Sequence, residues 1–199
     1  ALPAGGAVVA SFYEGPEPGE SARALNEKLG NVLSGALSAS RFSGKCEEVM
    51  VLPAQGPYSR VVLVGLGKKA EIDEAAFQAA GAAVGNALLA SGEKTITFMA
   101  DKVKGVENPG AEFALGAMLK TWRFDTYRTM QKPEQKPSLA EIKLAVAKPE
   151  VERKAFAAYE KLGTSVHLTR QLVSEPGNIL NPVSFAAKIV SELRPLGVK

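Results

Sequence analysis

The sequence has few of the residues that build disulfide frameworks or metal sites, with one cysteine and one histidine among 199 residues. A lone cysteine, Cys46, excludes a disulfide within the chain and fits a reducing compartment, so we expect the cytoplasm. The only imidazole belongs to His167. Any chemistry at a thiol or an imidazole would therefore depend on these two side chains.

Long apolar runs and blocks of charge are also missing. The longest apolar run, 61–66, is far too short for a membrane-spanning helix and suits a buried strand. The run 7–10 lacks the basic segment and the length of a secretory signal. A formal net charge of +3 is small for this length, so a pI of about 8.9 does not by itself indicate nucleic-acid binding. We expect no membrane contact.

What is abundant is hydrophobic sequence, 46% of the residues, arranged in two alternating periodicities. Short β-branched segments predict strands, and apolar residues at three- and four-residue spacing predict helices. The predicted strands are 6–13, 47–52, 59–64, 95–99 and 142–146. The predicted helices are 21–36, 73–88, 109–122, 150–173 and 182–194. Strands that alternate with helices predict an α/β fold, with a mixed sheet flanked by helices.

The helix predicted at 150–173 is the longest, at roughly 35 Å, and we interpret it as a connection between domains. An apolar stripe on it comprises Ala155, Tyr159, Leu162, Val166 and Val173. The segment 172–186 then indicates a helix end, a Pro-Gly-Asn turn and a new helix behind an Asn-Pro cap. We expect a first domain at 1–148, a connecting helix at 149–173 and the start of a second domain at 174–199, where 197–199 would open a strand.

The sequence Gly65-Leu66-Gly67-Lys68-Lys69-Ala70 follows a predicted strand and has the G-x-G-x-x-A spacing of a dinucleotide-binding turn. The next predicted helix begins only near Asp73, and the nearest acidic strand end, Asp101, comes too late in the sequence. Glycines at a strand-to-helix turn are also common for backbone reasons alone. We therefore favour a structural role for these glycines.

No group of residues predicts catalysis or metal binding. The neighbouring Glu47 and Glu48 would point to opposite faces of a strand, and Asp73 and Glu74 suit a helix start. His167 has no second ligand four residues away and is interpreted as a solvated or interdomain packing residue. Cys46 is interpreted as a small core residue. We assign no catalytic, cofactor-binding or metal-binding residue to this chain.

The densest basic stretch carries Arg123, Arg128, Lys132 and Lys136. Aromatic residues at 122, 124 and 127 alternate with these cations, a composition that can face a phosphate backbone. The simpler interpretation, which we prefer, is a helix end that runs into a solvated, proline-containing loop.

Three strings in the expected order resemble the leucyl aminopeptidases, the cytosol aminopeptidase family. They are Val61 to Lys68, the segment 114–128 with its Arg-Phe-Asp-Thr-Tyr-Arg sequence, and Leu172 to Ala186 with its Ser-Glu-Pro-Gly-Asn turn. Together they cover most of the chain. The resemblance implies an N-terminal α/β domain similar to macro domains, joined by a long helix to a larger catalytic domain.

The resemblance also implies a homohexamer that removes N-terminal residues from peptides with two divalent metals, zinc, manganese or magnesium. The family signature Asn-Thr-Asp-Ala-Glu-Gly-Arg, which carries several ligands, does not occur here. We therefore expect the catalytic domain to follow Lys199 and this chain to be inactive alone, with a role in assembly and active-site access. Two alternatives remain: a free-standing macro-like module that binds ADP-ribose or a nucleotide at Gly65 to Ala70, and a DNA-binding adaptor that uses Arg123 to Lys136.

Overall fold

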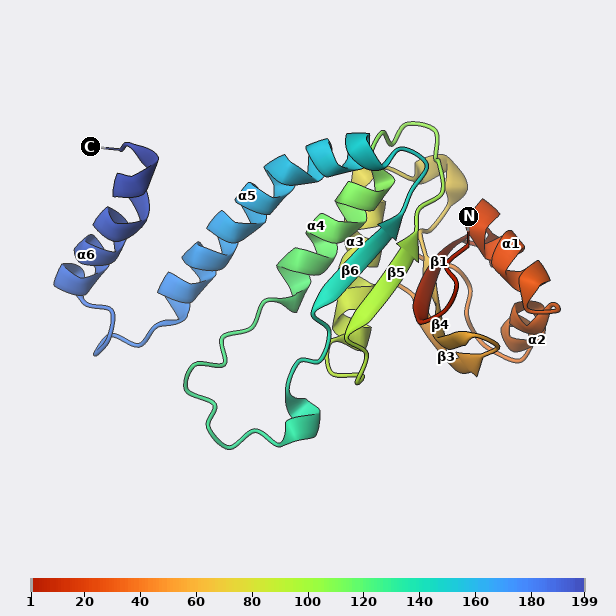
Figure 1. The fold of residues 1–199 in the computed structure, drawn as a ribbon, viewed down its shortest axis with the longest axis horizontal. Helices are drawn as coiled ribbons and strands as arrows, with labels where there is room; N and C mark the ends of the chain where they lie inside the picture. The colour runs from red at the N-terminus through yellow and green to blue at the C-terminus, as the bar shows by residue number, and fades with distance from the viewer. Residues whose placement is uncertain (1, 199) are drawn as a thin grey trace.

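The computed structural model describes residues 2–198 and contains a six-stranded mixed sheet (Figure 1). Its strands are β1 (Ala7–Tyr13), β2 (Glu17–Pro18), β3 (Val49–Gln55), β4 (Tyr58–Gly65), β5 (Thr95–Met99) and β6 (Glu141–Ala145). They lie in the order β3-β4-β1-β5-β6, with the short β2 paired to β1. The pairs β4-β1, β1-β5 and β5-β6 are parallel, while β3 is antiparallel to β4. The predicted fold class is confirmed.

Helices cover both faces of this sheet. The helices are α1 (Glu20–Lys28), α2 (Val32–Ser38), α3 (Glu74–Leu88), α4 (Pro109–Thr121), α5 (Pro149–Ser174) and α6 (Pro182–Leu193), with short 3₁₀ turns η1 (Lys69–Glu71), η2 (Pro133–Gln135) and η3 (Arg194–Leu196). Leu25 of α1 and Leu33 of α2 pack on one face, and Phe77 of α3 and Phe113 of α4 pack on the other. Within the described residues, none of the helices combines the length and the apolar character that a membrane crossing requires.

β1 is the centre of the core, because all seven of its residues are buried. Val8 and Ala10 contact the α1-α2 side, and Val9 contacts the α3-α4 side. A strand buried on both faces is apolar at nearly every position, which explains the hydrophobic segment that the sequence shows there. The buried polar residue in β1, Ser11, has a hydroxyl that donates a hydrogen bond to Asp101.

The single helix predicted at 21–36 is wrong, since the structure divides it into α1 and α2. Gly30 and Asn31 both adopt left-handed backbone conformations, with φ of 64° and 65°, which no continuous α-helix accommodates. The Asn26 side-chain oxygen accepts from the amides of Leu33 and Ser34, at 3.0 and 3.2 Å, and so caps the new helix. The turn separates the two helices while Leu25 and Leu33 remain in the same core cluster.

The predicted pair of strands at 47–52 and 59–64 is confirmed as an antiparallel hairpin, but its boundaries move. β3 begins at Val49 and continues through Pro53 to Gln55, leaving Gly56 and Pro57 as the turn. Proline is tolerated because β3 is the outer strand of the sheet. Glu47 and Glu48 therefore precede the strand and do not lie on opposite faces of it.

α5 runs beside α4 and leads to α6, which lies away from the sheet at the blue end of the chain in Figure 1. On the predicted apolar stripe of α5, Leu162 and Val173 are 52% and 82% exposed. The predicted turn is confirmed: the amides of Ile179 and Leu180 both donate to the carbonyl of Pro176. Asn181 caps α6 by accepting from the amides at 183 and 184. Gly197 ends the following 3₁₀ turn η3 in a left-handed conformation and opens no strand, while Lys199 lies outside the described residues.

Candidate functional site

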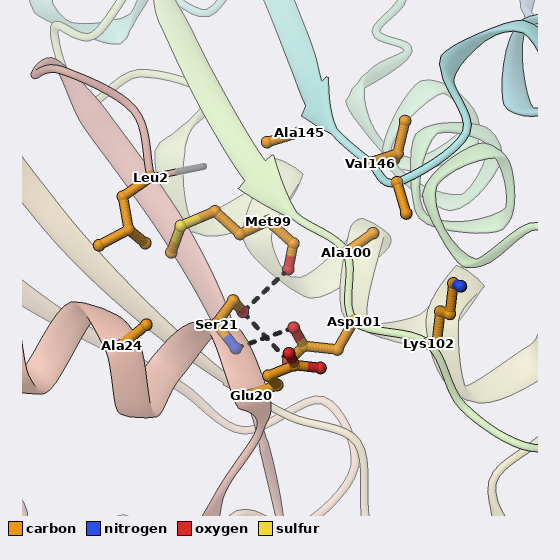
Figure 2. A pocket seen from close by; sticks show the side chains of 11 residues that line it. Leu2, Glu20, Ser21, Ala24, Met99, Ala100, Asp101, Lys102, Ala145 and Val146 are labelled. Carbon is orange, nitrogen blue, oxygen red and sulfur yellow. Dashed lines mark hydrogen bonds between the residues drawn. The ribbon is translucent and has the colours of Figure 1, made fainter.

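The sheet topology singles out the carboxyl ends of β1 and β5. After β1 the chain leads to α1 on one face, and after β5 it leads to α4 on the other. In open α/β sheets such a switch point is where ligands usually bind. A cleft of about 530 Å³ lies here, within the size range of small-molecule sites. Its lining includes Leu2, Glu20, Ser21, Met99, Asp101 and Val146 (Figure 2).

Asp101 is the polar centre of this cleft and is only 8% exposed. One carboxylate oxygen accepts from the Ser21 amide at 2.9 Å. The other accepts from the hydroxyls of Ser21, at 3.1 Å, and Ser11, at 3.4 Å. Figure 2 shows the Asp101 side chain turned toward the start of α1. The carboxylate thereby links β1, β5 and α1.

This arrangement replaces a missing helix cap. The residue before α1 is Gly19, which has no side chain to bind the first amides. A Cβ at Gly19 would lie 2.3 Å from an Asp101 carboxylate oxygen, so glycine is what lets the carboxylate approach. Burial raises the pKa of Asp101, and the nearby Glu20 carboxylate adds to that rise, while the serine hydrogen bonds oppose it.

The chemistry available in the cleft is limited. The residues lining it include no thiol or imidazole, and the carboxylate of Asp101 is already engaged with Ser11 and Ser21. Apolar side chains form much of the remaining wall. We therefore assign Asp101 a structural role at the switch point. Sequence reasoning considered Asp101 only as a poor nucleotide ligand, although an acidic residue just after a buried strand was a signal of this position.

The Gly65 to Ala70 segment is shaped by close backbone packing. A Cβ at Gly65 would lie 2.0 Å from the Lys45 carbonyl oxygen, and Gly67 has a φ of 84°. α3 begins several residues later, and the Asp73 side chain caps it by accepting from the Ala76 amide at 3.0 Å. The predicted N-cap is confirmed. Its carboxylate occupies the helix N-terminus at which a phosphate would have to bind.

The residues weighed as metal ligands lie apart from one another. Glu48 accepts hydrogen bonds from the amide and the hydroxyl of Ser43, at 2.9 and 2.8 Å, and so stabilises the turn between these two residues. His167 is half-buried on α5 with its Nε2 atom 3.0 Å from the Met118 carbonyl oxygen, so it packs within the body of the chain. Across residues 2–198, no three His, Cys, Asp or Glu side chains form a group that could hold a metal ion. These residues do not fit a dinuclear metal centre.

The interpretation of Cys46 as a core residue is wrong, because its side chain is exposed. The residue lies in the turn that precedes β3, beside Gly67. The close approach of this turn to Gly65 and Gly67 leaves the thiol outside the core.

The basic stretch is held together by Asp125. The carboxylate of Asp125 pairs with Arg123 at 2.7 Å and lies 3.6 Å from Arg128. The Tyr127 hydroxyl donates to Glu175 at 2.6 Å. Lys132 and Lys136 are exposed on a loop that contains one short 3₁₀ turn. The solvated-loop interpretation fits Lys132 and Lys136, whereas Arg123 and Arg128 are paired with Asp125.

Comparison with known proteins gives consistent matches. The family model described as "Cytosol aminopeptidase family, N-terminal domain" matches residues 8–131. The probable cytosol aminopeptidase of Caulobacter vibrioides is 35% identical over 189 residues, which is 94% of this chain and 38% of that protein. The probable cytosol aminopeptidase of Afipia carboxidovorans is 34% identical over 199 residues, 98% of this chain and 39% of that protein.

Solved structures agree with these relatives. The bottromycin maturation enzyme BotP aligns with a TM-score of 0.72 at 26% identity, over 100% of this chain and 38% of that chain. A mutant of tomato leucine aminopeptidase aligns with a TM-score of 0.78 at 24% identity, over 97% of this chain and 40% of that chain, and shows the likeness of the fold. The chain thus spans well under half the length of the proteins that it matches.

Proposed function

Because the chain belongs to the cytosol aminopeptidase family, as its N-terminal domain, we propose that it is the non-catalytic part of a metal-dependent aminopeptidase. The whole protein would remove N-terminal residues from peptides, with a preference for leucine-like residues. Two divalent metals, zinc, manganese or magnesium, would be bound by a catalytic domain that follows Lys199. The named relatives support this proposal, since each is a probable cytosol aminopeptidase of which this chain matches about two fifths.

The observation that carries the proposal is the state of α6. This helix has no buried residue among those the structure describes, yet Phe185, Ile189 and Leu193 recur every four residues along it. They are 41%, 36% and 38% exposed. An amphipathic helix with an uncovered apolar stripe needs a partner to bury it. A catalytic domain that begins near residue 174 would supply that partner.

The domain's own contribution would be to support assembly of a homohexamer and to shape access to the active sites. Its location would be the cytoplasm, a proposal supported by the naming of the relatives as cytosol aminopeptidases. The division proposed from the sequence is 1–148, 149–173 and 174–199, and the succession of an α/β body and the long helix α5 supports it.

Hydrolysis of leucine p-nitroanilide with added Mn²⁺ tests the proposal. The 199-residue chain is expected to show no turnover above the blank, and the longer product of the same gene is expected to show metal-dependent turnover. Cys46→Ser in the longer product is the matched control, because it removes the only thiol of this region without touching a packed residue. Turnover by the chain alone, or its absence from the longer product, would overturn the proposal.

A further inference from the structure

α4 lacks a local cap at its N-terminus and obtains one from α5. The preceding residue, Asn108, makes no capping hydrogen bond with its side chain. Instead the Glu152 carboxylate accepts from the amides of Gly110, at 3.4 Å, and Ala111, at 2.8 Å. Glu152 is 7% exposed, and a carboxylate at this end of a helix complements both the free amides and the dipole.

The opposite end of α4 is bound by the same helix. His167 lies 3.0 Å from the Met118 carbonyl oxygen, and the Arg170 guanidinium donates to the Leu119 carbonyl oxygen. Arg170 also lies over the ring of Trp122, 6.0 Å from its centre. Carbonyls of the last helical turn have no backbone amide partner within their own helix, and cationic groups are favoured there.

Between the two ends, α5 makes a third polar contact with α4. The Tyr159 hydroxyl donates to Glu112 at 2.5 Å, and Glu112 is 3% exposed. One turn further, Gly163 faces Met118 so closely that a Cβ would lie 2.6 Å from its sulfur. The positions 152, 159, 163, 167 and 170 fall on one face of the helix.

The hydrogen bonds to α4 end at Arg170, before α5 does, and the Tyr127 hydroxyl binds the chain once more at Glu175, at 2.6 Å. Val173 is 82% exposed, and residues 175–181 contain turns without a helix or strand. Figure 1 shows α6 beyond this segment, apart from the sheet. The long helix therefore belongs to the N-terminal body along most of its length.

We propose that α5 is a splint, meaning a helix that caps both ends of α4, so that the N-terminal body extends to Glu175 and the joint to the remaining protein is 176–181. This inference goes beyond the proposed function, because it holds for any partner that follows α6. It also moves the end of the N-terminal body from residue 148 to residue 175.

Site-specific hydrogen exchange tests the cap at the N-terminal end. Glu152→Ala is expected to speed exchange of the Ala111 amide by at least about fivefold, as the loss of a helix cap would. Glu150→Ala is the matched control, because Glu150 lies on the same turn, is exposed and, among residues 2–198, pairs with Arg153 alone. Glu152→Gln keeps an acceptor and should fall between the two. Equal exchange at Ala111 in the Glu152→Ala and Glu150→Ala variants would overturn the proposal.

The other end has its own probe in Trp122, the only tryptophan. Arg170→Ala is expected to shift Trp122 emission to longer wavelength, while the exposed Arg153→Ala should leave the emission unchanged. Thermolysin, which cuts before large apolar residues, is then expected to cut the unaltered chain first near Ile179 or Leu180. A first cut between β6 and α5, or unchanged Trp122 emission in Arg170→Ala, would refute the splint.

Discussion

Removing the carboxylate of Asp101 should destabilise the fold in a way that depends on the replacement. Asp101→Ala deletes the acceptor for the Ser21 amide, a loss of about 1 kcal/mol for a helix cap. It also leaves the buried hydroxyl of Ser11 without its partner, at about 1–3 kcal/mol. The expected loss in free energy of unfolding is therefore about 2–4 kcal/mol. Asp73→Ala, which removes a single exposed cap, should cost only about 1 kcal/mol.

Asp101→Asn separates the hydrogen bonds from the charge. An amide oxygen still accepts from Ser21, and the cost of burying a charge disappears. Because burial raises the pKa of Asp101 above its usual 3.8, the native state favours the protonated form. The protonated Asp101 side chain therefore contributes its full stabilisation at pH values below its pKa in the unfolded chain. This contribution is lost as pH rises through the pKa of Asp101 in the folded state. Wild type should therefore lose stability relative to Asp101→Asn as pH rises from about 4 towards neutrality.

Urea unfolding, followed by Trp122 fluorescence and by circular dichroism at several pH values, measures both effects. The Asn variant should be close to wild type at neutral pH, and the Ala variant should be the least stable. If Asn costs as much as Ala at neutral pH, or if Ala costs no more than Asp73→Ala, the assignment of Asp101 as a remote cap is refuted.

Two further predictions concern helix packing and alkaline pH. A Cβ at Gly116 would lie 1.8 Å from the Gln78 carbonyl oxygen, so Gly116→Ala should force α3 and α4 apart and cost about 2–4 kcal/mol in chemical denaturation. In α2 no atom lies within 4 Å of the position that a Cβ at Gly35 would occupy, so Gly35→Ala should increase the free energy of unfolding by about 0.5–1 kcal/mol. Similar effects in the Gly116 and Gly35 variants would contradict this packing argument. The hydrogen bond to Glu112 raises the pKa of Tyr159 to about 12. The contribution of this hydroxyl to the free energy of unfolding is therefore present below the normal pKa of 10.0 and is lost as pH rises through about 12. Stability measured from pH 10 to 12 should fall less steeply in Tyr159→Phe, and parallel curves would contradict the role of this hydroxyl.

Strands and helices with strong local patterns were predictable from the sequence. β5 was predicted at its observed boundaries, and the caps at Asp73 and Asn181 were identified, because each depends on residues within a few positions of one another. The division between α1 and α2 was missed, since Gly30 and Asn31 interrupt a periodicity of apolar residues that continues across both helices. Where a left-handed turn preserves the apolar face, hydrophobic spacing alone does not show the break.

The candidate site was less accessible to sequence reasoning than the fold. Asp101 stands 80 residues from Ser21, and only the sheet order brings the two together at the carboxyl ends of β1 and β5. The glycines at 65 and 67 matched a nucleotide-binding spacing, but glycine is required at these positions because the turn at 44–46 approaches their backbone closely. The sequence showed that glycine was needed at these positions but did not show which segment packs against them.

By itself the sequence determined the α/β class, the long helix, the turn at 176–180 and the family resemblance, because these depend on local periodicity, local caps and the order of short strings. Tertiary structure alone decided that a buried carboxylate caps α1 from β5 and that α5 caps α4 at both ends. Each of these contacts joins residues at least 40 positions apart. A buried polar group must form hydrogen bonds with whichever groups the packing places beside it. The spacing of residues along the chain does not reveal which groups those are.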